Sequence, residues 1–180
     1  ELLLSYLKIN HKIARYLNDG QKITINGPQE IKPKNFTVGG DPSSAAFFIV
    51  AGLILKKSKI TLTDVVINKT RTAYIKILKK MGGNIKIQKT KKRSGEQLGK
   101  ITVSSSTLKG ISIPSKLSPY LIDEYPILAI AATCAKGTTK MNGLNELRFK
   151  ESDRIKSIHN NLKKCLIDCR VLQDNIIIKG

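Results

Sequence analysis

The residue types best suited to chemistry gather in one charged run, Arg148-Phe149-Lys150-Glu151-Ser152-Asp153-Arg154. At helical spacing, Lys150 and Arg154 share one face of a helix, and Glu151 lies three residues before Arg154, close enough to meet it. Two cations beside a carboxylate, at the positive end of a helix, can grip a phosphate or carboxylate group and hold an acid or base next to it. The structural alternative is a solvated helix start whose acidic residues answer the helix dipole.

Asp123 is the second candidate, because it stands where an apolar helix opens and carries a carboxylate that can exchange a proton. Asp41 holds the equivalent place before another apolar helix, so both aspartates can also be plain helix N-caps. Arg71 enters a helix in the same way, as an anion ligand or as a surface residue, and we favour the surface. Spacing alone leaves both roles of Asp123 open.

The pattern of apolar residues predicts the helices and strands that must position these side chains. Helices are predicted over 10–18, 42–56, 70–81, 122–136 and 150–164. Strands are predicted over 22–25, 36–38, 59–63, 84–89, 100–104, 111–113, 139–141, 169–172 and 175–179, with a hairpin loop at 90–99. The helices at 42–56 and 122–136 are apolar nearly all round, so each is expected to be buried on every side.

Two copies of a strand-helix-strand-helix-strand-strand unit therefore follow one another along the chain. Asp41 aligns with Asp123, and Lys79-Lys80-Met81 aligns with Lys163-Lys164-Cys165. Internal repetition on this scale indicates a repeated architecture. We expect an α/β fold with the apolar helices inside and with sheets and amphipathic helices around them.

Composition limits the classes of function. The 180 residues are 41% hydrophobic and 25% charged, which suits a packed core. A count of 32 Lys and Arg against 13 Asp and Glu gives a net charge of +19, which attracts nucleic acid, anionic membranes or phosphorylated metabolites unless it reflects a general preference for Lys. The 3 cysteines form no disulfide framework, and such an odd, sparse count is typical of reduced thiols in a cytoplasm. With only 2 histidines, the sequence also shows no metal-ligand pattern. The apolar runs are too short to cross a bilayer.

Three blocks of this sequence closely resemble the EPSP synthase family, also called the 3-phosphoshikimate 1-carboxyvinyltransferases. They are residues 40–47 (Gly-Asp-Pro-Ser-Ser-Ala-Ala-Phe), 123–129 (Asp-Glu-Tyr-Pro-Ile-Leu-Ala) and 146–154, which ends in the specific Lys-Glu-Ser-Asp-Arg. The stretch 68–81 is also similar, with Lys69 and Ala73 where the family has Pro and Gly. Of the family's Ser-Arg-x-His motif, His11 alone is kept.

The resemblance implies an α/β fold of two enolpyruvyl transferase-like lobes, each built from three βαβαββ units around buried parallel helices. By analogy, residues 1–38 end the other lobe, and residues 39–180 form two repeats of one lobe, about 39–120 and 121–180. The chain then holds about two and a half units. Because it begins with Glu1 rather than Met, we expect it to be a piece of a longer enzyme.

The resemblance also implies a reaction. The family transfers the enolpyruvyl group of phosphoenolpyruvate to the 5-hydroxyl of shikimate 3-phosphate and releases phosphate, on the shikimate pathway to chorismate and the aromatic amino acids. Asp123 would contact the shikimate hydroxyl as proton acceptor, Glu151 would be the partner acid/base, Lys150 would lie near both substrates and Arg154 would bind phosphoenolpyruvate. No metal or organic cofactor would take part. We expect a cytoplasmic enzyme, monomeric at full length, that uses neither nucleic acid nor membrane as a partner, and an isolated chain that is inactive.

Three other interpretations stay open. The sister enolpyruvyl transferase that acts on UDP-N-acetylglucosamine shares the fold, although the Lys-Glu-Ser-Asp-Arg block argues against it. A basic nucleic-acid-binding module would explain the charge of +19, but aromatic residues make up 5% and tryptophan is absent. The third is a non-catalytic remnant with the same fold.

Overall fold

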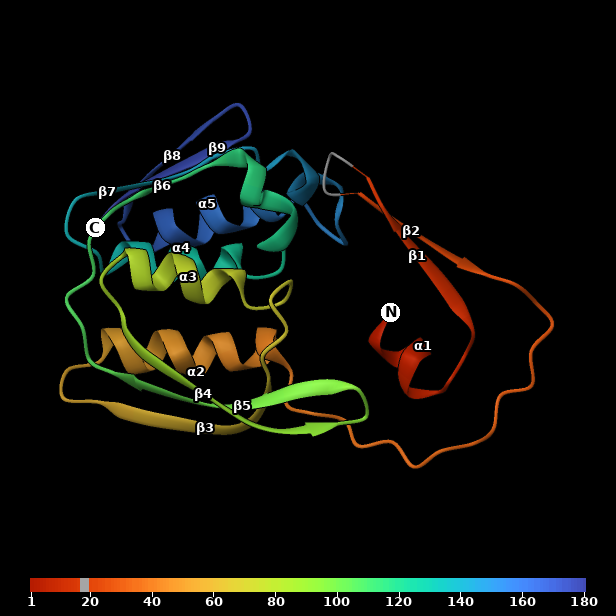
Figure 1. Cartoon of the computed structure of the whole chain (residues 1–180). Coiled ribbons are helices and arrows are strands. Elements are labelled where there is room, and N and C mark those ends of the chain that lie inside the picture. The colour runs from red at the N-terminus through yellow and green to blue at the C-terminus, as the bar shows by residue number, and fades with distance from the viewer. Residues whose placement is uncertain (17–19) are drawn as a thin grey trace.

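The computed structural model describes residues 1–16 and 20–180, in which helices lie between two separate β-sheets (Figure 1). The first sheet has three antiparallel strands in the order β3-β5-β4: β3 (Lys59–Val66), β4 (Asn84–Arg93) and β5 (Glu96–Ser104). The second has the order β6-β7-β9-β8: β6 (Ser112–Ile113), β7 (Thr138–Met141), β8 (Asp168–Leu172) and β9 (Asn175–Lys179). The pair β6–β7 is parallel and the other two pairs are antiparallel.

The helices fill the space between the sheets, so the predicted α/β class is confirmed. They are α2 (Pro42–Ile54), α3 (Ala73–Lys80), α4 (Tyr125–Thr133) and α5 (Arg154–Lys164), with two 3₁₀ helices, η1 (Ser115–Tyr120) and η2 (Asn145–Phe149). In Figure 1, α2 lies on the first sheet, α5 lies under the second, and α3 and α4 occupy the middle. Within the described residues, none of the helices has the length and apolar content needed to span a bilayer.

The two sheets repeat one topology. Gly40 makes an isolated parallel bridge with Val65 of β3, and this bridge stands where β6 stands beside β7. With that bridge counted, both halves follow the βαβαββ order. The sheets divide between β5 and β6, at residues 105–111, whereas the sequence placed the division near 120. The difference arises because the short segment 112–113 pairs with β7 rather than closing the first sheet.

The two apolar helices form the centre of the core. The fully or nearly buried side chains of α2 and α4 are Pro42, Ala45, Ala46, Ile49, Val50, Leu53, Tyr125, Ile127, Leu128, Ala129, Ala131 and Ala132. On α2, Gly52 lies so close to β5 that a Cβ there would be 2.3 Å from Val103 Cγ2. Burial on every side is nevertheless wrong for one face, because Phe47 and Phe48 are each 58% exposed.

The start of each long helix follows from its first residues. Asp41 Oδ2 accepts a hydrogen bond from the backbone N–H of Ser44 at 2.8 Å, and Pro42 follows as the first helical residue of α2. Asp153 Oδ1 accepts from the backbone N–H of Lys156 at 3.0 Å, so α5 begins at Arg154. The predicted cap at Asp41 is confirmed, and the charged helix begins four residues later than the sequence suggested.

The N-terminal segment differs most from the prediction. It holds α1 (Leu2–Tyr6) and an antiparallel hairpin of β1 (His11–Arg15) and β2 (Gln21–Ile25), which lie to one side of the two sheets (Figure 1). A helix over 10–18 is therefore wrong for 11–15, because pairing with β2 satisfies the backbone there; residues 17 and 18 of that prediction lie outside the described residues. The predicted strand at 36–38 is irregular chain.

The long hairpin of the first sheet also extends beyond its prediction. Strands β4 and β5 continue through most of 90–99, and the chain reverses at Ser94 and Gly95, which both have positive φ. The loop prediction failed because backbone pairing continues across polar side chains that carry no alternating apolar pattern.

Candidate active site

Arg154 joins the two candidate carboxylates. Its Nη1 donates to Asp123 Oδ1 at 3.0 Å, and its Nη2 donates to Glu151 Oε2 at 3.0 Å. The Arg154 side chain is 26% exposed, whereas those of Asp123 and Glu151 are 57% and 83% exposed. The structure therefore brings three of the four predicted site residues together, with the carboxylates open to solvent and the cation between them.

Lys150 and Glu151 stand in the turn between η2 and α5. Lys150 ends η2 with an extended backbone (φ −85°, ψ −166°), and Asp153 caps the helix that follows. The expectation that Lys150 and Arg154 share one helix face is therefore wrong, because α5 begins only at Arg154. The predicted contact between Glu151 and Arg154 is present and is made across the turn.

The charges of this cluster reinforce one another. The pKa of Glu151 is lowered from its usual 4.5, first by a hydrogen bond from its own backbone and then by the Arg154 guanidinium, with a smaller effect of Lys150. The pKa of Arg154 is raised, mainly by its hydrogen bond to Asp123. At neutral pH the cluster thus holds an ionised Glu151 carboxylate and a guanidinium, and an incoming anion competes with carboxylates for Arg154.

Asp123 and Asp41 do not play equivalent parts. The N-cap of α4 is Glu124, one residue later, so the interpretation of Asp123 as a plain cap is wrong. Asp41 does cap its helix. The Asp123 carboxylate accepts a hydrogen bond from Arg154 at the start of α5.

Sequence reasoning missed the contact between Ser43 and Glu124 beside Asp123. Glu124 is 5% exposed and its Oε1 accepts a hydrogen bond from Ser43 Oγ at 2.6 Å. Arg71 Nη2 donates to Asp41 Oδ1 at 2.9 Å and to Ser43 Oγ at 3.1 Å. Arg71 lies at the surface as predicted, with 52% of its side chain exposed, and it forms an ion pair there with Asp41. The sequence signal for this contact was the acidic Glu124 at the edge of an apolar helix, and that signal does not identify Ser43 of α2 as its partner.

A small cavity of about 60 Å³ opens at this place. Its lining residues come from three segments of the chain that meet there: Thr70, Arg71, Pro119, Tyr120, Ile122, Asp123 and Glu124. The lining of this cavity includes one cationic side chain, Arg71, and two carboxylates, Asp123 and Glu124. The cavity is therefore the polar end of the candidate site.

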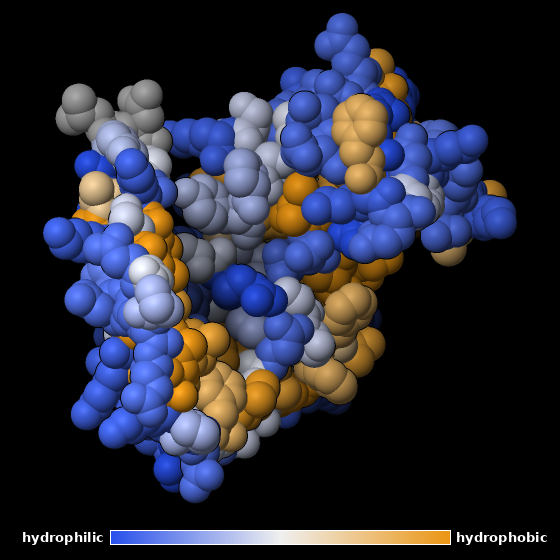
Figure 2. Space-filling view, turned by 90° about the vertical axis from the view of Figure 1, so that its right-hand side faces the viewer, coloured by the Kyte–Doolittle hydropathy of each residue, from blue (hydrophilic) through white to orange (hydrophobic). Residues whose placement is uncertain are grey.

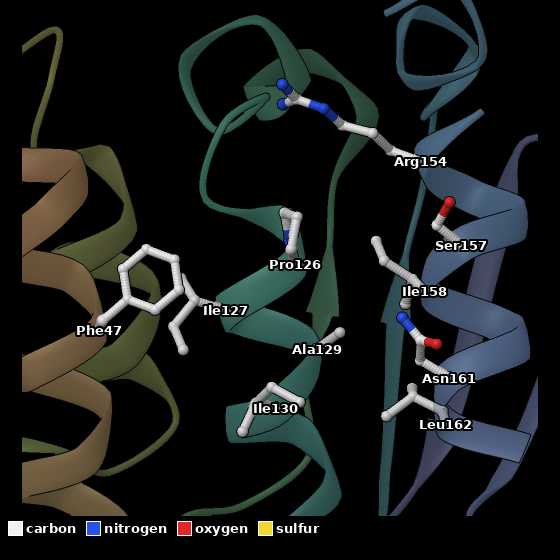
Figure 3. Close-up of a pocket in the computed structure, with 10 residues that line it drawn as sticks. All are labelled: Phe47, Pro126, Ile127, Ala129, Ile130, Arg154, Ser157, Ile158, Asn161 and Leu162. Atoms are coloured by element: carbon white, nitrogen blue, oxygen red, sulfur yellow. The ribbon is translucent and has the colours of Figure 1, made fainter. Parts of the chain in front are cut away.

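A larger cavity of about 320 Å³ lies between α2, α4 and α5 (Figure 3). Phe47, Ile127, Ile130 and Ile158 contribute to its mostly apolar walls. Figure 3 shows the Arg154 side chain at one end, extending over the start of α4 and away from the apolar walls. The space-filling view also shows a hollowed face on which hydrophilic and hydrophobic surfaces lie side by side (Figure 2). Arg154 is the charged residue of this lining, and its guanidinium provides a place for an anionic group at that end.

The ability to hold a metal can be judged from the donor side chains. Among residues 1–16 and 20–180, the His, Cys, Asp and Glu side chains form no group of three or more that could bind a metal ion.

The buried carboxyl of Glu124 predicts a pH-dependent stability. Burial raises its pKa above 4.5 and Asp123 adds to this, whereas the Ser43 hydrogen bond and Arg71 oppose it. The folded state therefore binds this proton more tightly than the unfolded state, and the stability that Glu124 contributes falls as the pH rises through the raised pKa.

The substitution Glu124→Gln removes this titration and keeps an acceptor oxygen for Ser43. We expect the free energy of unfolding of the variant, relative to the parent, to increase as the pH rises above 4.5 and to level off above the raised pKa of Glu124. Urea unfolding at a series of pH values measures this difference, and a difference that does not change with pH would contradict the assignment.

Comparisons with known proteins give this geometry a family context. The sequence model of the family described as EPSP synthase (3-phosphoshikimate 1-carboxyvinyltransferase) matches residues 8–180. A 3-phosphoshikimate 1-carboxyvinyltransferase of Rhodospirillum rubrum is 39% identical over 180 residues, which is 100% of this chain and 40% of the relative. One of Clostridium tetani is 41% identical over 180 residues, again 100% of this chain and 40% of the relative.

A solved structure agrees with this likeness. The EPSP synthase of Acinetobacter baumannii superposes with a TM-score of 0.89 at 39% identity, over 99% of this chain and 39% of that chain. The predicted fold class is thereby confirmed. The chain spans about 40% of the length of these curated relatives.

Proposed function

This chain belongs to the EPSP synthase family, and we propose that it supplies one part of an active site that transfers the enolpyruvyl group of phosphoenolpyruvate to the 5-hydroxyl of shikimate 3-phosphate. The observation that carries the proposal is the Arg154 guanidinium, which bridges Asp123 and Glu151 at 3.0 Å each. A fixed cation between two carboxylates provides both an anion ligand and two groups for proton transfer.

The two carboxylates divide the proton transfers. In the addition step, the 5-hydroxyl oxygen of shikimate 3-phosphate bonds to C2 of phosphoenolpyruvate, loses its proton to Asp123, and the methylene carbon C3 gains a proton. In the elimination step, C3 loses a proton, the double bond reforms, and the C2–O bond to phosphate breaks. Glu151 is the partner acid/base, and its exposed position leaves room for a substrate between the two groups.

The cations hold the substrates. Both substrates are polyanions, and a guanidinium binds carboxylate and phosphate oxygens with two parallel N–H donors. Arg154 binds phosphoenolpyruvate, and Lys150, exposed in the turn beside Glu151, lies near both substrates. The apolar cavity below Arg154 offers no comparable set of charges, which supports placing the substrates at the Asp123 end.

The remaining charged residues of the site belong to the part of the enzyme that corresponds to the relatives' length outside the 40% that this chain matches. In this proposal, residues 1–38 belong to one lobe and residues 39–180 form two repeats of the other, divided at 105–111. The separation of the β1–β2 hairpin from the two sheets supports the first assignment (Figure 1). The isolated chain is then inactive, because stabilising the transition state takes charges from both lobes.

We assign the enzyme to the cytoplasm as a monomer that binds neither nucleic acid nor membrane. The free state of Cys134, Cys165 and Cys169, two of them exposed, supports a reducing compartment. Small phosphorylated substrates are consistent with the chain's net charge of +19 without a macromolecular partner.

A chimaeric enzyme tests the proposed function. This chain would replace the 180 residues with which it aligns in the R. rubrum relative, and a matched chimaera would carry the C. tetani segment, which also aligns over 180 residues. We expect phosphate release that requires both phosphoenolpyruvate and shikimate 3-phosphate, and none with UDP-N-acetylglucosamine as acceptor. An active C. tetani chimaera beside an inactive one with this chain would contradict the proposal. Normal turnover by the isolated chain would contradict the proposal that the active site needs residues from both lobes.

A further inference from the structure

Four side chains form a hydrogen-bonded set between the starts of α2 and α4. Arg71 donates to Asp41 and to Ser43, and Ser43 donates to Glu124. Ser43 and Glu124 are 81 positions apart in the sequence, so the set connects the two repeats. We call Asp41, Ser43, Arg71 and Glu124 the cap network.

The donor directions within the cap network are fixed by chemistry. Ser43 has one hydroxyl proton, a guanidinium has no acceptor and an ionised carboxylate has no donor, so Ser43 accepts from Arg71 and donates to the Glu124 carboxylate. The separation of 2.6 Å between Ser43 Oγ and Glu124 Oε1 is that of a hydrogen bond to a charged acceptor. Because Glu124 is 5% exposed, leaving its carboxyl without that bond would be costly.

The cap network is more than a way to join two helices. A buried carboxylate has a desolvation cost, and apolar side chains of similar volume hold helices together without it. Glu124 is also the N-cap residue of α4, yet its carboxylate reaches across to α2 rather than to the amides of its own helix. Unlike an apolar contact, the hydrogen bond between Ser43 and Glu124 is directional, so it also fixes the orientation of the backbone at Glu124.

That backbone carries Asp123. The two residues are adjacent, and both line the small cavity of about 60 Å³ together with Arg71. Asp123 is 57% exposed and its side chain is held at its tip, by Arg154 Nη1 at 3.0 Å. The position of the Asp123 carboxylate therefore depends on how firmly the peptide between Asp123 and Glu124 is anchored, and Glu124 is the anchored partner.

We propose that the cap network positions Asp123 against Arg154, with Ser43 and Glu124 as positioning residues that do not themselves touch the substrates. The inference rests on the proposed function for its kinetic consequence, but the placement of Asp123 can be measured without turnover.

The kinetic experiment uses the active chimaera. We expect Ser43→Ala and Glu124→Ala each to lower kcat by about 10- to 100-fold, with a smaller change in KM, because a slight displacement of a catalytic group has effects of this size. Glu124→Gln keeps the acceptor oxygen and should recover most of the loss. The double variant Ser43→Ala/Glu124→Ala should lose little more than either single variant, since both remove the same bond.

The matched control is Ser44→Ala. Its hydroxyl lies one residue away on the same turn and donates to Asp41 Oδ2 at 2.9 Å, so the variant loses a hydroxyl bond at the Asp41 end of the cap network and keeps the bond between Ser43 and Glu124. We expect it to leave kcat within about twofold, as surface substitutions usually do.

The second measurement uses the 180-residue chain itself. The side-chain ¹⁵N–¹H resonances of Arg154 report its bonds to Asp123, and free rotation of the guanidinium broadens or averages them. We expect Ser43→Ala to shift these resonances and to accelerate the rotation several-fold, and Ser44→Ala to leave them unchanged.

The two measurements separate the inference from the proposed function. Altered Arg154 resonances in Ser43→Ala together with an inactive parent chimaera would remove the proposed function and keep the positioning role. An active parent in which Ser43→Ala and Ser44→Ala give the same kcat and the same resonances would overturn the inference. A lowered melting temperature of Ser43→Ala with unchanged kcat and resonances would also overturn it, because the network would then be structural alone.

Discussion

Replacing Asp123 by Asn should reduce kcat of the active chimaera by about 10²- to 10⁴-fold, the usual contribution of a group that transfers a proton. Asn has nearly the same size and can still accept a hydrogen bond from Arg154, so the geometry at the start of α5 should be kept. It cannot take the proton of the 5-hydroxyl. Steady-state phosphate release at saturating concentrations of both substrates measures the loss.

The matched control is Glu146→Gln. Glu146 is an exposed carboxylate in η2, five positions before Glu151, and its neutralisation changes the same overall charge by the same amount. We expect kcat to change by less than about twofold, as for other surface substitutions. Equal losses in the two variants would mean that a general effect of charge, and not proton transfer by Asp123, explains the result.

Replacing Ile49 by Ala should lower the free energy of unfolding by about 2–5 kcal/mol, which is the range for truncating a buried aliphatic side chain. Ile49 is 0% exposed on α2, between the first sheet and α4, so the substitution leaves a cavity in the centre of the core. Urea unfolding of the 180-residue chain at neutral pH measures the change.

The neighbouring residue gives the control. Phe48 is larger than Ile49 but is 58% exposed, so Phe48→Ala removes more atoms and less buried contact. We expect it to change the free energy of unfolding by less than about 0.5 kcal/mol. Equal destabilisation by Phe48→Ala and Ile49→Ala would contradict this expectation, because it would mean that the Phe48 side chain is buried in solution.

Local patterns were sufficient for most of the fold. The cap at Asp41, the two apolar helices and the strands of both sheets follow from short-range signals that tertiary contacts do not overturn. The failures have a common cause. The β1–β2 hairpin, the pairing of β6 with β7 and the continuation of β4 and β5 through polar residues all depend on partners elsewhere in the chain, which a local window does not contain.

The candidate site divides in the same way. The contact between Glu151 and Arg154 follows from a spacing of three residues, whereas Asp123 could be joined to them only through the family resemblance. The bond between Ser43 and Glu124 was missed, because no periodicity links the start of one apolar helix to the start of another. Sequence thus supplied the residue types of the site, and the tertiary structure supplied the anchoring.

The repeats of this chain do not make it modular. The buried residues of α2 and α4 belong to one hydrophobic cluster that draws on both halves. The segment between the sheets is itself fastened, since Gly110 N–H donates to Lys136 O at 2.9 Å and Lys136 N–H donates to Leu108 O at 2.8 Å. Neither half would retain a complete hydrophobic core if the chain were cleaved between the sheets. Heating should therefore unfold residues 39–180 in one cooperative step, with calorimetric and van't Hoff enthalpies that agree.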